Sequence, residues 1–342
     1  MRLIRGSVGF SIALALVLAG PLSSQTPAPA KQGAVERIKV HGKALEGNLE
    51  GDSPDRDVFV YLPPGYADNP SQRYPVVYLL HGYGLTAERW MTFANIAAAA
   101  DRGIAAGITK EMILVNPDAF TKYNGSMYSS SPTIGDWETF IAEDLVSYID
   151  SHYRTIPNRM SRGLGGHSMG GYGTMRIGMK RPDVFSSLYP MSSCCLLNSP
   201  GAQGNRGAGA RGEGRGGRGG AFANAQSAQA AAWASNPNNP PQYFDLPIKD
   251  GQPQPLVIAK FAANSPLAMI DQYLTNLKKY QAIMIDVGTE DGLAASNRQM
   301  SQILMDFGVA HTFETYEGNH TNRVAERMET KVLPFFSKHL SR

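Results

Sequence analysis

The chain has 342 residues, a formal net charge of +3, 36 glycines and two cysteines. This length fits one large domain or two ordinary ones, and a content of 42% hydrophobic and 18% charged residues excludes a globally disordered chain. Two cysteines exclude a disulfide scaffold and a four-cysteine zinc site, and the small net charge argues against a nucleic-acid or membrane-surface protein.

The N-terminus has the pattern of a secretory signal. Two arginines precede a short apolar run over 8–19, and small residues follow as far as Ser24. We therefore predict a signal peptide over 1–24, a flexible leader over 25–34 and a secreted or periplasmic protein. An uncleaved N-terminal anchor is the alternative. The apolar run is shorter than the ~20 residues of a membrane helix, so no stable span is expected after cleavage.

From residue 56 onward, strand-like and helix-like segments alternate. Continuous apolar runs such as PVVYLL at 75–80 predict strands covered on both faces, and apolar residues at three- and four-residue spacing predict an amphipathic helix over 136–153. This alternation predicts an α/β domain over 35–342, with a mainly parallel central sheet and helices on both faces. The expected strands are 57–62, 75–80, 112–115, 162–166, 185–191, 282–287 and 312–316; the further helices are 171–180, 299–307 and 323–340.

The alternation fails over about 198–255. Residues 201–220 hold 10 of the 36 glycines, and alanine/glutamine-rich and asparagine/proline-rich runs follow. Such composition buries little apolar area, so we expect a low-complexity Gly/Arg-rich insertion that is partly mobile. Its arginines favour either a flexible linker or a polyanion-binding segment. No nucleic-acid partner is expected, since 201–220 contains no aromatic residue to stack on a base.

Gly166-His167-Ser168-Met169-Gly170 matches the G-x-S-x-G pattern of a nucleophile elbow. A strand-like segment precedes it and a helix-like segment follows, which is the context that the motif requires. Glycines two residues before and after the serine allow a sharp turn, and the helix N-terminus favours developing negative charge. We therefore expect Ser168 to be a nucleophile.

A serine hydroxyl needs a base, and in this fold class the acid and the histidine follow the serine in chain order. His320 comes just after the expected strand 312–316, at the carboxyl edge of the sheet, where open α/β folds bind ligands. Asp291 likewise comes shortly after the expected strand 282–287. Glu290 is the alternative acid, whereas Asp286 lies within the strand and is expected to be structural.

The loop after strand 75–80 carries glycines, as an oxyanion loop should. The backbone N–H groups of Tyr83 and Met169 are the expected oxyanion-hole donors. His81 precedes the serine, so we expect it to anchor this loop by hydrogen bonds. His81 and His167 lack an evident third ligand, so neither a metal nor a cofactor is expected.

Tyr83, Trp90 and Trp137 are candidate substrate-binding residues, with buried packing as the alternative for each. Phe120 and Tyr123 are candidates of the same kind, with the same alternative.

Cys194 and Cys195 are adjacent. A bond between neighbours would close a strained ring, so two free, half-buried thiols are expected and a vicinal disulfide is the alternative.

At these motifs the chain resembles the putative-esterase (esterase D-like) family of α/β-hydrolases, which includes feruloyl and acetyl carbohydrate esterases, S-formylglutathione hydrolases and the mycolyltransferases of the antigen 85 group. The resemblance implies the α/β-hydrolase fold, a catalytic triad of Ser168, Asp291 and His320, and a cap between the serine and acid halves. The matching segments are VYLPPGY (60–66), RYPVVYLLHGYG (73–84), GDWETFIAEDLVSYIDSHYRT (135–155), GGHSMGGYGTMRIGMKRPDVF (165–185), IDVGTEDG (285–292) and EGNH (317–320).

The expected activity is that of an exported serine carboxylic-ester hydrolase using an acyl-enzyme. Its expected substrates are short-acyl, feruloyl or acetyl esters of carbohydrate-like alcohols, either small molecules or oligosaccharides. An acyltransferase of the mycolyltransferase type and a polyanion-binding protein acting through the Gly/Arg-rich insertion are the alternatives.

Overall fold

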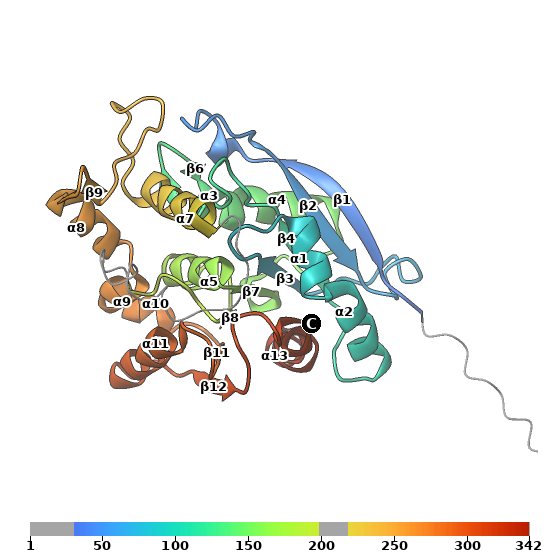
Figure 1. Ribbon diagram of the computed structural model, residues 1–342. Coiled ribbons are helices and arrows are strands. Elements are labelled where there is room, and N and C mark those ends of the chain that lie inside the picture. The colour runs from blue at the N-terminus through green and yellow to red at the C-terminus, as the bar shows by residue number, and fades with distance from the viewer. Residues whose placement is uncertain (1–30, 198–217, 342) are drawn as a thin grey trace, which may run out of the picture. The chain divides into compact units, whose positions relative to one another are not determined.

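The computed structural model describes residues 31–197 and 218–341 (Figure 1). The predicted signal peptide over 1–24, most of the predicted leader and the glycine-rich part of the insertion lie outside the described residues. Within the described ranges, no helix is both long enough and apolar enough to cross a membrane.

The main sheet of the described residues has eight strands. Along the chain they are β1 (Ala34–His41), β2 (Asp55–Leu62), β3 (Val76–Leu80), β4 (Ile113–Pro117), β7 (Arg162–His167), β8 (Ser187–Met191), β11 (Ala282–Gly288) and β12 (Thr312–Tyr316). Their spatial order is β1-β2-β4-β3-β7-β8-β11-β12. The β1–β2 and β2–β4 pairs are antiparallel and every other neighbouring pair is parallel, so the predicted mainly parallel sheet is confirmed.

Two short hairpins and a series of helices complete the described chain. The hairpins pair β5 (Ser130–Ser131) with β6 (Gly135–Asp136) and β9 (Ile248–Lys249) with β10 (Gln252–Pro253). The helices are α1 (Ala87–Phe93), α2 (Ile96–Ala105), α3 (Trp137–Thr139), α4 (Leu145–His152), α5 (Met169–Lys180), α7 (Arg218–Trp233), α8 (Pro255–Ala263), α9 (Pro266–Met269), α10 (Leu274–Leu277), α11 (Ala294–Asp306), α12 (Val324–Arg327) and α13 (Leu333–His339). The π-helical turns are η2 (Phe140–Asp144) and η5 (Met328–Val332), and the 3₁₀ turns are η1 (Lys43–Leu45), η3 (Arg159–Ser161) and η4 (Ile270–Tyr273).

Helices cover both faces of the sheet, as predicted. Side chains of a strand point alternately to its two faces, and the five residues of β3 divide accordingly. Val76, Tyr78 and Leu80 belong to the core shared with α4, α5, α7 and α11. Val77 and Leu79 belong to the core shared with α1, α2 and α13. All five are buried, which explains why β3 reads as a continuous apolar run.

Strand β1 and the helices α1 and α2 were not predicted from the sequence. The strand begins at Ala34, the last residue of the predicted leader, and most of its side chains are exposed. Two of them, Arg37 and Lys39, pair with Asp57 on β2. An edge strand with charged outward residues lacks the apolar pattern that marks a buried strand. It was therefore indistinguishable from a polar leader by composition.

The expectation that the insertion buries little apolar area is wrong for α7. Ala230 and Ala231 are fully buried and Trp233 is 5% exposed, all within the core beside α5. The Trp233 indole N–H donates to Ser129 Oγ at 3.1 Å, and its ring meets Phe261 edge-on at 5.3 Å. Alanine is the best helix former because it loses no side-chain entropy, so an alanine-rich run can form a well-packed helix.

Candidate active site

Ser168 lies at the sharp turn between β7 and α5. Its backbone has φ 58° and ψ −110°, a region that residues other than glycine rarely adopt. A Cβ added at Gly166 would lie 2.6 Å from the Gly170 carbonyl oxygen, and one added at Gly170 would lie 2.0 Å from that of Leu80. The two glycines of the motif are therefore required by the close approach of backbone around the serine.

The structure brings the three predicted triad residues together. The Ser168 hydroxyl lies 2.9 Å from His320 Nε2, and His320 Nδ1 lies 2.8 Å from Asp291 Oδ2. The other carboxylate oxygen of Asp291 accepts the Leu293 N–H at 2.9 Å. With the proton on Nδ1 donated to Asp291, Nε2 is left to accept from the serine. This is the arrangement that a general base for Ser168 requires.

The alternative acids lie elsewhere. Glu290 is exposed, and its backbone N–H donates to the Gly318 carbonyl. Asp286 is fully buried within β11, where it accepts from the Tyr189 hydroxyl at 2.8 Å and pairs with Arg327 at 2.7 Å. Asp286 is thus held in a structural network, as the sequence analysis expected.

Asp291 is held in its charged form. Burial of this side chain, which is 2% exposed, favours the neutral acid, but hydrogen bonding and charge from His320 and the Leu293 N–H outweigh burial and lower the pKa of Asp291. A carboxylate at this position accepts the His320 Nδ1 proton and stabilises the imidazolium formed when His320 takes a second proton.

His167 contacts the loop that carries His320. Its Nε2–H donates to the backbone carbonyl of His320 at 2.8 Å, and the two rings lie 4.6 Å apart. The His167 ring is also nearly parallel to that of Trp90, with an interplanar angle of 11° and ring centres 6.2 Å apart. Burial and the neighbouring His320 lower the pKa of His167 to about 3. The ring is therefore neutral at physiological pH, and its one proton sits on Nε2 because a carbonyl can only accept.

The loop after β3 lies against the nucleophile. A Cβ added at Gly82 would lie 3.5 Å from Ser168 Cβ. One added at Gly125 would lie 2.6 Å from Met169 Sδ and 2.9 Å from Tyr83 Cδ2, so Tyr83 and Met169 face a common neighbour. Met169 is the first residue of α5, where a backbone N–H has no partner within the helix. Both predicted oxyanion donors thus belong to segments beside Ser168, and their role stays a prediction.

His81 anchors this loop through its own backbone contacts. Its ring is buried, Nδ1–H donates to the Gly82 carbonyl at 2.9 Å, and Nε2 accepts the Ala119 N–H at 2.8 Å. Burial lowers the pKa of His81, which keeps the ring in this neutral form. The hydrogen-bonding role predicted for His81 agrees with these contacts.

Two of the three candidate substrate-binding residues are core residues. Trp90 is fully buried and stacks on His167, and Trp137 is 1% exposed and donates its indole N–H to the Ile134 carbonyl. Neither side chain has a surface that a substrate could contact, so the predictions for Trp90 and Trp137 are wrong. Tyr83 is half-buried and stays a candidate.

The insertion contributes to the surroundings of the site, which the sequence analysis missed. The Gln229 side-chain amide of α7 donates to Cys195 Sγ at 3.4 Å. Phe244 meets the ring of Tyr123 edge-on at 5.3 Å, and Ser131 Oγ donates to the Ala231 carbonyl at 2.7 Å. One feature of the sequence could have indicated that this part of the insertion is folded. Trp233 stands at the end of the alanine-rich run, and so large an apolar side chain is usually buried.

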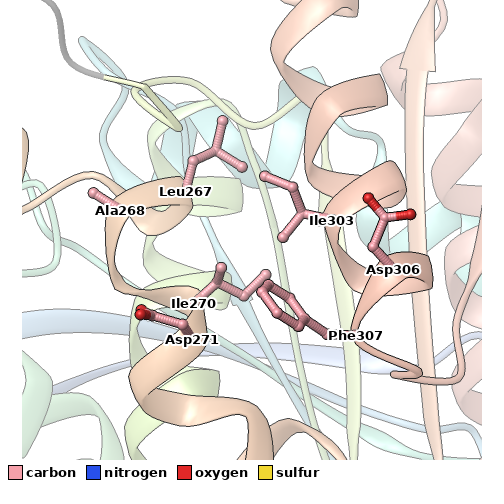
Figure 2. A pocket seen from close by; sticks show the side chains of 7 residues that line it. All are labelled: Leu267, Ala268, Ile270, Asp271, Ile303, Asp306 and Phe307. Atoms are coloured by element: carbon pink, nitrogen blue, oxygen red, sulfur yellow. The ribbon is translucent and has the colours of Figure 1, made fainter.

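A cavity of about 370 Å³ lies apart from this chemistry, between α9 and η4 on one side and α11 on the other (Figure 2). It contains none of the triad residues. Two aspartates and five apolar residues line it: Leu267, Ala268, Ile270, Asp271, Ile303, Asp306 and Phe307. In the parts of the chain that the structure describes, no group of three or more His, Cys, Asp or Glu side chains could hold a metal ion.

Comparison with known proteins agrees with this geometry. The family described as "Putative esterase" matches residues 53–325. An endo-1,4-beta-xylanase/feruloyl esterase of Xylanibacter ruminicola is 33% identical over 131 residues, which make up 37% of this chain and 18% of that protein. An esterase of Mycobacterium tuberculosis is 34% identical over 131 residues, covering 38% of this chain and 27% of that protein. The matched segments thus span less than a third of either relative.

Solved structures with the same fold cover nearly the whole chain. A ferulic acid esterase superposes with a TM-score of 0.66 at 22% identity, covering 90% of this chain and 99% of the other. A fluorophosphonate-binding serine hydrolase of Staphylococcus aureus gives a TM-score of 0.62 at 17% identity, covering 90% and 99%. These likenesses confirm the predicted α/β-hydrolase fold.

Proposed function

We propose, since the chain belongs to the putative-esterase family of serine hydrolases, that it hydrolyses carboxylic esters through an acyl-enzyme on Ser168. The observation that carries this proposal is the hydrogen-bonded chain from Ser168 through His320 to Asp291. A hydroxyl, an imidazole with a free Nε2 and a buried carboxylate are the groups that such chemistry needs.

In the proposed mechanism, Ser168 Oγ attacks the ester carbonyl while His320 Nε2 takes its proton. Asp291 holds the Nδ1–H and stabilises the resulting imidazolium. The N–H groups of Tyr83 and Met169 donate to the oxyanion of the tetrahedral intermediate. His320 then gives its proton to the leaving alkoxide, and in the second half a water molecule, deprotonated by His320, releases the acid from Ser168.

For the substrate, we propose short-acyl, feruloyl or acetyl esters of carbohydrate-like alcohols. The support is the activity for which two of the similar proteins are named, a xylanase/feruloyl esterase and a ferulic acid esterase. A panel of p-nitrophenyl esters of rising acyl length, methyl ferulate and acetylated xylan tests this proposal. Turnover restricted to long-chain acyl esters would contradict it. Adding a sugar acceptor and analysing the products separates hydrolysis from acyl transfer.

We also propose that the protein is exported. The support is the sequence of residues 1–24, with two arginines before a short apolar run. Expression in a bacterial host followed by N-terminal sequencing of the protein outside the cytoplasm tests this. Retention of Met1 on protein confined to the cytoplasm would contradict it.

The nucleophile is tested by Ser168→Ala. We expect kcat for p-nitrophenyl acetate to fall roughly 10⁶-fold, as in other triad enzymes that lose the serine. Labelling by a fluorophosphonate should disappear as well. Ser151→Ala, at an exposed serine of α4, is the matched control and should keep wild-type turnover and labelling. Wild-type turnover by Ser168→Ala would refute the assignment.

A further inference from the structure

Two thiols border the nucleophile, and the proposed mechanism uses neither. Cys194 and Cys195 follow β8, and both are free and half-buried, as predicted for the thiol pair. The Cys194 N–H donates to the Ser168 carbonyl at 3.1 Å. The Cys195 sulfur accepts the Gln229 amide at 3.4 Å. The pair therefore links the nucleophile turn to helix α7.

The surroundings of these sulfurs disfavour reactions of a single thiolate. The hydrogen bond between the two thiols, together with burial, raises the pKa of Cys194 well above its ordinary value. A protonated thiol is a poor nucleophile toward alkylating agents. A reagent that takes both sulfurs at once gains from their high effective concentration, because after the first bond forms the second is intramolecular.

The backbone conformation of Cys195 also favours a site formed by both sulfurs. Cys195 has φ 58°, a left-handed conformation that residues other than glycine rarely adopt. Such a conformation persists where surrounding contacts hold it, here the Cys194 bond to Ser168 and the Gln229 bond to Cys195. The two adjacent sulfurs are thus presented by a fixed piece of backbone.

We propose that Cys194 and Cys195 form a two-sulfur site for a soft, thiophilic metalloid or metal, and that occupancy of this site blocks Ser168. Soft sulfur ligands select soft ions, and a trivalent arsenic centre displaces the thiol protons as its bonds to sulfur form. No third His, Cys, Asp or Glu ligand joins the pair within the described residues, which suits an organic arsenic(III) centre that keeps one carbon substituent and needs two sulfurs. Because the Cys194 N–H meets the Ser168 carbonyl at 3.1 Å, an atom bound to this pair is held beside the nucleophile turn, where the ester must enter.

The reaction of the two thiols with an arsenic(III) compound needs no oxidant. With phenylarsine oxide as the probe, two As–S bonds form and two S–H bonds break. The two protons leave with the arsenic-bound oxygen as one water molecule, and arsenic stays trivalent. A dithiol such as 2,3-dimercaptopropanol reverses the reaction. Its two sulfurs replace the cysteine sulfurs on arsenic, and its two protons return to the cysteines.

The test uses the full chain and phenylarsine oxide. We expect the intact mass to increase by one phenylarsenic group, fluorophosphonate labelling of Ser168 to stop, and both changes to reverse with 2,3-dimercaptopropanol. Iodoacetamide at the same concentration should react much more slowly. The single variants Cys194→Ser and Cys195→Ser should each need roughly 100-fold more arsenical for the same effect, since each loses the intramolecular second bond.

Several outcomes would overturn the proposal: no added mass, equal sensitivity of the wild type and both single variants, or added mass with unchanged labelling of Ser168. A loss of two hydrogens instead of a gain of arsenic would show that the pair closes to a disulfide and would also overturn it. The mass and labelling readouts do not need ester turnover. A failure of the proposed hydrolase activity is therefore distinguishable from a failure of this site.

Discussion

His167 illustrates how a residue outside the triad can position it. Its Nε2–H donates to the His320 carbonyl, and its ring centre lies 6.2 Å from that of Trp90 and 4.6 Å from that of His320. Because the pKa of His167 is lowered to about 3, the ring is neutral near pH 7 and its single proton is available for this bond. The sequence placed His167 at the variable position of the motif, with no signal of which backbone group it would meet.

We predict that His167→Leu lowers kcat by roughly 10–100-fold with little change in KM, since a displacement of about 1 Å in a catalytic group can cost that much. His167→Gln keeps an amide donor near the same carbonyl and should recover most of the rate. The far-downfield proton NMR signal of His320 Nδ1–H should weaken in the leucine variant and return in the glutamine variant. Equal losses of kcat in both variants would show that the donor is unimportant.

Asp291 gives a prediction with a defined pH dependence. Asp291→Asn should lower kcat about 10⁴-fold, because the amide favours the wrong His320 tautomer. The folded pKa of Asp291 lies below its ordinary value of 3.8. Its charge therefore stabilises the fold above that ordinary value, and the contribution is lost as the pH falls through the folded pKa.

The difference in unfolding free energy between the wild type and Asp291→Asn should accordingly shrink between pH 7 and pH 3. Urea unfolding at both pH values measures it. A difference that grows toward acid pH would mean that burial has a larger effect on the pKa of Asp291 than His320 has.

Among elements, the predictable ones were those whose environment leaves a pattern in the sequence. Strands β3 and β11 are covered on both faces, so their residues are almost all apolar. The triad followed from chain order and from the position of Asp291 and His320 just after strands. The edge strand β1 and helix α7 left no such pattern, because one exposes charged side chains and the other buries small ones.

Helix α7 should therefore behave as part of the folded core. Trp233→Ala is expected to cost about 3–5 kcal/mol of unfolding free energy, the usual loss for a buried aromatic side chain. The substitution removes ring contacts to Tyr172, at 5.5 Å between ring centres, and to Phe261, at 5.3 Å. It also removes the indole N–H that donates to Ser129 Oγ. Urea unfolding measures the loss. The matched control is Leu246→Ala, at a residue that is 38% exposed, which should stay within about 0.5 kcal/mol.

At the scale of the whole domain, one buried arginine joins the elements that carry the acid and the base. Arg327, in α12, pairs with Asp286 of β11 at 2.7 Å and with Glu314 of β12 at 2.8 Å. Its guanidinium also lies 4.5 Å from the ring centre of Tyr316, the last residue of β12. Strand β11 leads to the Asp291 loop and β12 to the His320 loop. The relative position of the two loops thus depends on this network.

Arg327→Met removes one partner of a buried ion pair and leaves Asp286 charged and unpaired, which typically costs about 3–5 kcal/mol. Burial already raises the pKa of Asp286, and Arg327 opposes that effect. Without the arginine, the folded pKa of Asp286 rises further above its unfolded value. The folded state of the variant then gains stability as the pH falls and Asp286 becomes protonated. The cost of Arg327→Met should therefore be larger at pH 8 than at pH 5.

The double variant Asp286→Asn/Arg327→Met separates this charge effect from lost packing. If the unpaired charge dominates, the double variant is more stable at pH 8 than Arg327→Met alone, and its unfolding free energy varies less between pH 5 and pH 8. If the two substitutions simply add, the coupling energy is near zero and the pair does not hold the two loops. Because Glu314 also contacts Arg327, Glu314→Gln is the matched control, and it should reproduce only the part of the loss that comes from the more exposed partner.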